Sequence, residues 1–136
     1  MNAMKKKVLV IDDEMTMRAL LEILLGKQYE VHAVGSAIEA LTWLDRNLPD
    51  LIISDIQMPD LDGFGFLKTV REKGYTRNTP IIMLSGKLES KERIKCYQLG
   101  AQDYLTKPFN PEELEEVIKK NLFPINNSNL WEIHCN

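Results

Sequence analysis

The chain has 136 residues, of which 44% are hydrophobic and 27% are charged, and its formal net charge is −3 at pH 7. This length corresponds to about one domain, which can bury a core without disulfides or structural metals. No apolar run approaches the ~18 residues needed to cross a bilayer, so we expect a soluble protein without a membrane role. The basic residues are scattered, which argues against direct nucleic-acid binding.

Two cysteines occur in the chain, Cys96 and Cys135, and their spacing fits neither a disulfide framework nor a metal motif. Free thiols are typical of a reducing compartment, so we expect a cytoplasmic protein. The lysines at residues 5–7 precede an apolar run that is too short for a signal peptide and that ends in acidic residues.

Apolar runs alternate with helical patterns along the chain. We predict strands at 8–11, 30–34, 51–54, 81–84 and 103–106, and helices at 15–26, 36–47, 63–73, 90–99 and 110–122. Such alternation predicts an α/β fold in which helices cover both faces of a parallel sheet. Right-handed crossovers and the apolar first and third strands favour a doubly wound, flavodoxin-like sheet of order 2-1-3-4-5.

The helix boundaries carry recognisable local signals. Ser36 and Glu39 form a capping box, Asn110 and Pro111 open the last helix, and Gly26 is a candidate C′ residue after the first. We assign residues 4–122 to one domain and residues 123–136 to a tail or the start of a linker, with no output domain. The apolar residues 130–134 either pack back on the body or begin another element.

Polar residues follow four of the predicted strands at the point where each strand ends. They are Asp12 and Asp13, Asp55, Ser85 and Gly86, and Lys107. In the predicted order, the acids lie beside the switch point of the sheet, where ligands of such folds bind. Crowded carboxylates repel one another, and Mg²⁺ prefers oxygen ligands, so the set predicts a magnesium site.

The same edge suits a phosphoryl group. Asp55 could attack phosphorus as a carboxylate nucleophile. Lys107 would hold one phosphoryl oxygen as a point charge, Ser85 could donate a hydrogen bond to another, and Gly86 leaves room for the group to enter.

Five motifs in order resemble the receiver domain of two-component response regulators over about residues 5–122. They are Asp12-Asp13, Ser54-Asp55-Ile56-Gln57-Met58-Pro59, Asp62-Gly63, Ser85-Gly86 and the segment from Gly100 to Phe109. The resemblance implies that Asp55 is the phosphoacceptor. It also implies that Mg²⁺, with Mn²⁺ as an alternative ion, is bound by Asp13, Asp55 and the Gln57 backbone carbonyl, with Asp12 acting mostly through water.

The resemblance assigns further roles around the site. Ser85 would follow the phosphoryl group and Tyr104 would report the activated state by its rotamer. The Lys107–Pro108 bond would be cis. Gln57 and Lys87 would flank the phosphoryl group at positions that tune its lifetime.

The resemblance also implies partners. A sensor histidine kinase or a histidine phosphotransfer protein would donate the phosphoryl group in a phosphorelay. A downstream protein would contact the face made by the fourth helix, fifth strand and fifth helix. The chain would catalyse only its own phosphorylation and dephosphorylation. Val117 stands where family members that dimerise through this face to bind DNA carry a basic residue, so we expect a monomer or a weak dimer.

Two other functions are compatible with the same topology. One is a receiver-like scaffold that binds partners constitutively and is never phosphorylated. The other is a flavin binder, which needs a phosphate-binding loop rich in Ser, Thr or Gly after the first strand. Asp12-Asp13-Glu14 occupies that loop and would repel a flavin phosphate.

Overall fold

The structure is a computed structural model that describes residues 4–86 and 89–124. The strands are β1 (Lys7–Ile11), β2 (Glu30–Val34), β3 (Leu51–Asp55), β4 (Ile81–Ser85) and β5 (Asp103–Thr106). The helices are α1 (Met15–Leu25), α2 (Ala37–Leu44), α3 (Gly63–Glu72), α4 (Ser90–Gln98) and α5 (Pro111–Leu122). All strand pairs are parallel and their order is β2-β1-β3-β4-β5, which confirms the predicted fold.

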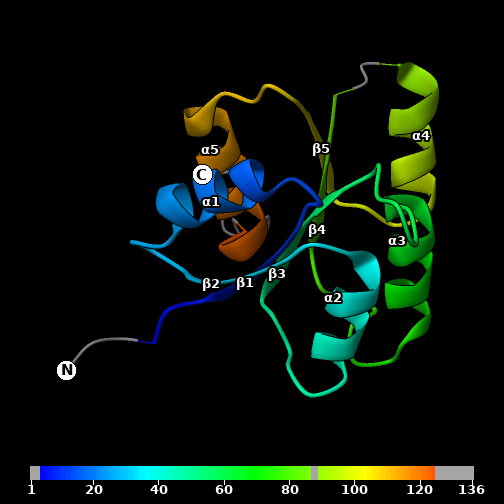
Figure 1. Cartoon of the computed structure of the whole chain (residues 1–136), viewed down its shortest axis with the longest axis horizontal. Helices are drawn as coiled ribbons and strands as arrows, with labels where there is room; N and C mark the ends of the chain where they lie inside the picture. The colour runs from blue at the N-terminus through cyan, green and yellow to red at the C-terminus, as the bar shows by residue number, and fades with distance from the viewer. Residues whose placement is uncertain (1–3, 87–88, 125–136) are drawn as a thin grey trace, which may run out of the picture.

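Helices cover both faces of the sheet. Figure 1 shows α1 and α5 on one side and α2, α3 and α4 on the other. Successive strand residues point to opposite faces, so each strand contributes to two cores. In β1, Leu9 and Ile11 pack with the α2 and α3 side, whereas Val8 and Val10 pack with the α1 and α5 side. A strand buried on both faces therefore has a continuous run of apolar residues in its sequence.

Among the described residues, no helix is both long and apolar enough to span a bilayer. The predictions for residues 87, 88 and 125–136, including Lys87, Cys135 and the apolar tail, lie outside the described part of the chain.

Side-chain caps begin three of the helices. The Ser36 hydroxyl accepts a hydrogen bond from the Glu39 backbone N–H at 3.1 Å, as the capping box predicts. The Glu39 carboxylate, however, accepts from the Gly35 N–H at 3.3 Å, one residue before the expected donor. The Asn110 side chain accepts from the N–H groups of the second and third residues of α5, which confirms its role as N-cap.

Some element boundaries differ from the prediction. β3 and β4 each extend by one residue, so Asp55 and Ser85 are themselves strand residues. α2 ends at Leu44, because the Asp45 N–H bonds back to the Thr42 carbonyl in a tighter turn. Gly26 caps α1 in the right-handed conformation, with φ −65°, so it is not the left-handed C′ residue expected.

The left-handed glycine lies instead at Gly100, between α4 and β5, with φ 103°. Arg71 covers it from α3 and donates to its carbonyl oxygen from both Nε and Nη2, at 3.0 and 2.8 Å. A side chain at Gly100 would meet the Arg71 guanidinium stem at about 3.0 Å. This clamp ties the start of β5 to the end of α3.

Gly63 allows α3 to approach the end of β3 closely. Its N–H donates to the Ile56 carbonyl at 2.7 Å. A Cβ at this position would lie 2.5 Å from the Asp55 carbonyl oxygen and 2.7 Å from the Ile56 Cα, and both neighbours are backbone atoms. The Asp62 side chain, which accepts from the Gly65 N–H at 2.9 Å, caps the same helix. The loop that leaves Asp55 is therefore held at both ends.

We expect Gly63→Ala to lower the free energy of unfolding by about 1–3 kcal/mol, because the added methyl group must displace backbone. Gly74→Ala is the matched control. A Cβ at Gly74 meets nothing within 4 Å, so this change should be neutral or stabilise by up to about 1 kcal/mol. Urea denaturation measures both values, and an equal loss in the two variants would contradict the close approach at Gly63.

Candidate functional site

The parallel register brings the ends of four strands to one edge of the sheet. Ile11 pairs with Ser54, Asp55 with Leu84, and Ser85 with Thr106. Because adjacent strands end at the same level, the residues that follow β1 and β5 lie beside the last residues of β3 and β4. This edge is the functional site that the sequence predicts.

Three carboxylates meet there. One oxygen from each of Asp12, Asp13 and Asp55 lies within 4.8 Å of the others. Asp12 and Asp55 are 1% and 6% exposed, whereas Asp13 is exposed to solvent. Carboxylates this close, with two of them largely removed from water, favour the arrival of a cation.

Lys107 supplies one positive charge to the cluster. Its Nζ lies 2.7 Å from Asp12 Oδ2, 3.5 Å from Asp55 Oδ1 and 3.9 Å from Glu14 Oε1. Burial by itself lowers the pKa of Lys107. The hydrogen bond to Asp12 and the charges of Asp55, Asp12 and Glu14 outweigh burial, and the pKa lies above its usual value. Lys107 therefore stays charged.

The backbone fixes the position of Lys107. Its N–H donates to the Ser85 carbonyl at 2.7 Å, which joins the loop after β5 to the end of β4. The Lys107–Pro108 peptide bond is cis.

Protein groups engage both oxygens of the Asp12 carboxylate. Oδ2 accepts from Lys107, and Oδ1 accepts from the Glu14 backbone N–H at 2.9 Å. The Asp12 carbonyl oxygen accepts from Arg18 Nη1 at 2.8 Å. Asp12 is thus the most constrained acid of the three, whereas Asp13 is the most accessible to solvent.

Arg18 and the carboxylate of Glu14 are site neighbours that the sequence analysis did not assign to the site. Glu14 lies just before α1, and its carboxylate faces Lys107. The available signal was helical spacing, because a residue four positions after Glu14 lies on the same face of α1.

Burial raises the pKa of the Asp55 carboxyl to about 6, with a further contribution from the charge of Asp12. Lys107 and the backbone N–H groups of Ile56 and Gln57 act in the opposite direction and only partly offset burial. The Ile56 N–H donates to Asp55 Oδ1 at 2.8 Å. A cation added beside the Asp55 carboxylate of the folded protein would therefore be favourable.

An open depression of about 520 Å³ lies over Asp55. Its lining residues are Asp13, Glu14, Asp55, Gln57, Gly86 and Lys107. A Cβ on Gly86 would meet no atom within 4 Å, so this glycine leaves free space at the rim and is not required by packing. The depression is large enough for a small anion and a hydrated cation.

Ser85 and Tyr104 lie side by side below the rim. Both are buried, at 1% and 8% exposure. Burial raises the pKa of the Tyr104 hydroxyl, and the interaction with the Ser85 side chain lowers it in part. The tyrosine ring thus occupies an inward position, in contact with the predicted phosphoryl-contacting serine.

Asp60 ties the loop after β3 to the start of α2. Oδ2 accepts from the Ile38 backbone N–H at 3.3 Å, and Oδ1 accepts from the Leu61 N–H at 2.8 Å. Both bonds lower the pKa of the exposed Asp60 carboxyl, and the bond from the Leu61 N–H has the larger effect. This bond to a helix 22 residues earlier in the chain leaves no local signal in the sequence.

The sequence matches the family model described as the response regulator receiver domain over residues 8–119. The "Probable transcriptional regulator ycf27" of Cyanophora paradoxa is 42% identical over 116 residues, which are 85% of this chain and 47% of that protein. The chain spans about half the length of the curated relatives first matched.

Comparison with solved structures supports the same family assignment. The chemotaxis response regulator CheY4 of Vibrio cholerae is 36% identical with a TM-score of 0.82, and the match covers 88% of this chain and 100% of that one. The receiver domain of the sensor histidine kinase PA1611 from Pseudomonas aeruginosa PAO1, solved with a magnesium ion coordinated in its active site cleft, is 29% identical with a TM-score of 0.80, covering 87% and 98%. The chain belongs to the response regulator receiver domain family.

We expect Asp55→Asn to raise the free energy of unfolding in magnesium-free buffer. Because the folded-state pKa of Asp55 lies above its unfolded value, the ionised carboxylate opposes folding as the pH rises through that interval. At pH 7.5 the gain should be on the order of 1–3 kcal/mol, since one pKa unit corresponds to about 1.4 kcal/mol.

Urea denaturation at pH 7.5 and at pH 4 measures the effect, which should shrink at the lower pH. Glu22→Gln on α1 removes an exposed acid outside the cluster and should change stability by less than about 0.5 kcal/mol. A loss of stability in Asp55→Asn would contradict a raised pKa of Asp55 in the folded protein.

Proposed function

We propose that this receiver domain is a phosphoryl-accepting switch in which Asp55 is the phosphoacceptor. The observation that carries the proposal is the meeting of Asp12, Asp13 and Asp55 within 4.8 Å, with the Lys107 ammonium 3.5 Å from Asp55. The donor would be the phosphohistidine of a sensor histidine kinase or of a histidine phosphotransfer protein. Membership in the receiver family supports this class of donor.

The donor set fits Mg²⁺, because each ligand offered is an oxygen. Asp13 and Asp55 would bind the ion directly, with the Gln57 backbone carbonyl. Asp12 would act mostly through water, which agrees with the engagement of both its oxygens by protein donors. Mn²⁺ has similar ligand preferences and is the alternative ion. Bound Mg²⁺ supplies positive charge that neutralises the carboxylates and offsets the charge of the transferring group.

Transfer to Asp55 is a nucleophilic displacement at phosphorus. The bond between a carboxylate oxygen and phosphorus forms as the phosphorus–nitrogen bond of the donor breaks, and the electron pair stays on the imidazole nitrogen. Lys107, already held near Asp55 by the cluster, pairs with a phosphoryl oxygen. Hydrolysis of the aspartyl phosphate returns the switch to its starting state, so the chain catalyses only reactions of its own site.

The switch would act through Ser85 and Tyr104. A phosphoryl group carries about −1.5 to −2 charge and three strong acceptor oxygens. The Ser85 hydroxyl, which interacts with Tyr104, would donate to one of these oxygens. A change in the interaction between the two side chains offers a direct route by which phosphorylation alters the packing of Tyr104 against α4.

The output would be a changed preference for a protein partner at the α4–β5–α5 face. Asp103 on this face is already engaged within the chain, by Lys120 at 3.2 Å and by Asn121 at 2.7 Å. Val117 is half-buried against the core and presents no charge. These contacts support a monomer or weak dimer that acts on a protein and does not itself bind nucleic acid.

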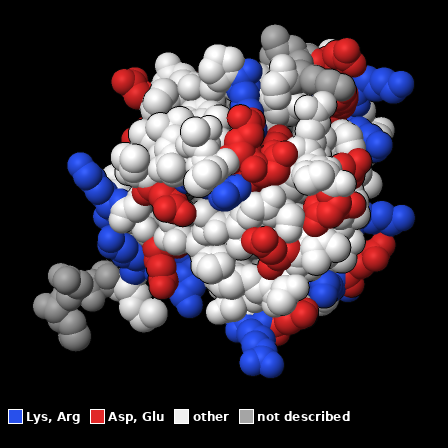
Figure 2. Space-filling model, viewed as in Figure 1, with Lys and Arg blue, Asp and Glu red and all other residues white. Residues whose placement is uncertain are grey.

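The distribution of charge on the viewed face agrees with this proposal. Figure 2 shows acidic side chains near the middle of that face, while Lys and Arg side chains lie mostly around its edge. Nucleic-acid-binding surfaces are instead marked by clustered basic residues.

Incubation with Mg²⁺ and acetyl phosphate tests the phosphoacceptor. We expect intact-mass spectrometry to show the gain of one phosphoryl group in the wild-type protein and none in Asp55→Asn. Asp62→Asn is the matched control. It changes an exposed acid of the same loop and keeps the oxygen that caps α3, so it should gain the group normally. A wild-type protein that gains nothing, or an equal gain in Asp55→Asn, would refute the proposal.

Isothermal titration calorimetry with MgCl₂ tests the metal site. We expect Asp13→Asn to weaken binding at least about tenfold, because loss even of groups that only support metal ligands costs 10–100-fold. Glu22→Gln should bind as the wild-type protein does. Unchanged affinity in Asp13→Asn would exclude this residue as a ligand.

A further inference from the structure

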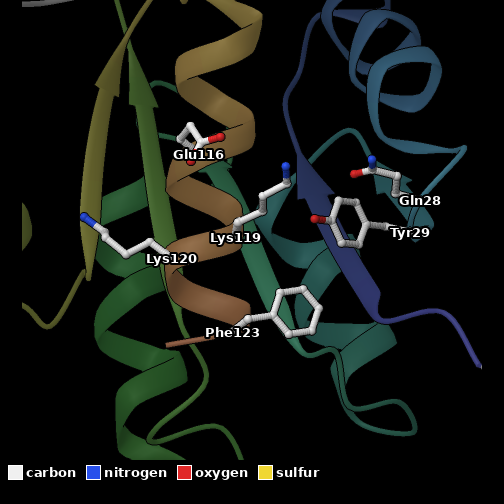
Figure 3. A pocket seen from close by; sticks show the side chains of 6 residues that line it. All are labelled: Gln28, Tyr29, Glu116, Lys119, Lys120 and Phe123. Atoms are coloured by element: carbon white, nitrogen blue, oxygen red, sulfur yellow. The ribbon is translucent and has the colours of Figure 1, made fainter. Parts of the chain in front are cut away.

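A groove outside the candidate site lies between the α1–β2 loop and the C-terminal half of α5. Its volume is about 580 Å³, and it is lined by Gln28, Tyr29, Glu116, Lys119, Lys120 and Phe123. In Figure 3 the Tyr29 ring, the Lys119 stem and the Phe123 ring surround the hollow. α5 starts near the site edge and runs away from it, so this groove lies at the opposite end of the sheet.

The groove has an apolar floor and one exposed apolar wall. Tyr29 is 5% exposed and packs into the core, whereas the Phe123 side chain is 57% exposed. Burial raises the pKa of the Tyr29 hydroxyl. Lys119 pairs with Glu115 at 3.3 Å, which leaves its methylene stem along the groove.

The chain turns away from the helix axis at this groove. α5 ends at Leu122, and Phe123 has φ −130° and ψ 66°, outside the helical region. Pro124 follows, and a residue before proline is disfavoured in the helical conformation. α5 therefore ends just before Phe123, which forms a wall of the groove.

We propose that the C-terminal segment, residues 125–136, docks in this groove through Leu130, Trp131 and Ile133. These are its large apolar residues after Ile125, and they follow a polar stretch at 126–129. Trp131 lies seven residue steps after Pro124, and these steps can span at most roughly 25 Å. The groove walls from Glu116 to Phe123 extend over about 10 Å of helix, so the segment is long enough to return.

Charge does not oppose the same occupant. The segment carries one acid, Glu132, and no lysine or arginine. Two lysines and one glutamate line the groove. In Figure 3 Lys119 extends towards Tyr29, and the Lys120 amino group points to the other side of α5. Covering Phe123 would remove exposed aromatic surface from water, which is favourable.

Tryptophan fluorescence of the full chain tests the proposal. Trp43 stacks on His32 at 4.8 Å between ring centroids, so Trp43→Phe keeps a ring there and leaves Trp131 as the single tryptophan. In this background we expect a blue-shifted Trp131 emission. Acrylamide quenching should be several-fold weaker than in the same protein unfolded in urea. Equal quenching in the folded and unfolded protein would overturn docking.

Two further variants in this background locate the contact. Phe123→Ser should raise quenching towards the unfolded value, because it removes a wall of the groove. Ile23→Ser is the control, since Ile23 is 72% exposed on α1 and does not line the groove. Circular dichroism verifies that both variants are folded. Protection that survives Phe123→Ser, or that Ile23→Ser removes equally, would overturn this groove as the site.

A dilution series separates docking within one chain from docking between two copies. Docking of the segment in its own groove predicts the same quenching at every protein concentration. Protection that is lost on dilution would assign the groove to a second copy and overturn the proposal.

Discussion

The Lys107 ammonium group allows three carboxylates to share one edge of the sheet. It lies 2.7 Å from Asp12 and 3.5 Å from Asp55, and charges at such distances interact strongly where water is excluded. Even so, Asp55 keeps a pKa of about 6, because the effect of burial exceeds that of Lys107. A metal ion would use this preference of the buried carboxylate for added positive charge.

The rest of the fold holds in place this edge of the sheet, where three carboxylates lie close together. β1, β3 and β4 are buried on both faces, and their side chains alternate between two cores. Burial of this apolar surface offsets the repulsion among the acids. Close backbone contacts then fix the loops, with Gly63 against Ile56 on one side and Lys107 against Ser85 on the other.

α5 links two ends of the molecule that have different chemistry. It begins just after the loop that carries Lys107, and it ends at the groove beside Phe123. A segment that covers this groove would leave the depression over Asp55 open, because the helix separates the two. The α4–β5–α5 face lies along the same helix and would remain available to a partner.

The sequence by itself determined the alternation of strands and helices, the order of the sheet and the identity of the acids at its edge. Those features depend on local periodicity and on short-range rules of chain connection. Only the tertiary structure decided that both oxygens of Asp12 are engaged, that Arg18 holds its carbonyl, and that Tyr104 lies against Ser85. The contacts of Asp12 with Lys107 and of Ser85 with Tyr104 join groups far apart in the chain. Burial, which raises the pKa of Asp55, exists only once the layers have packed.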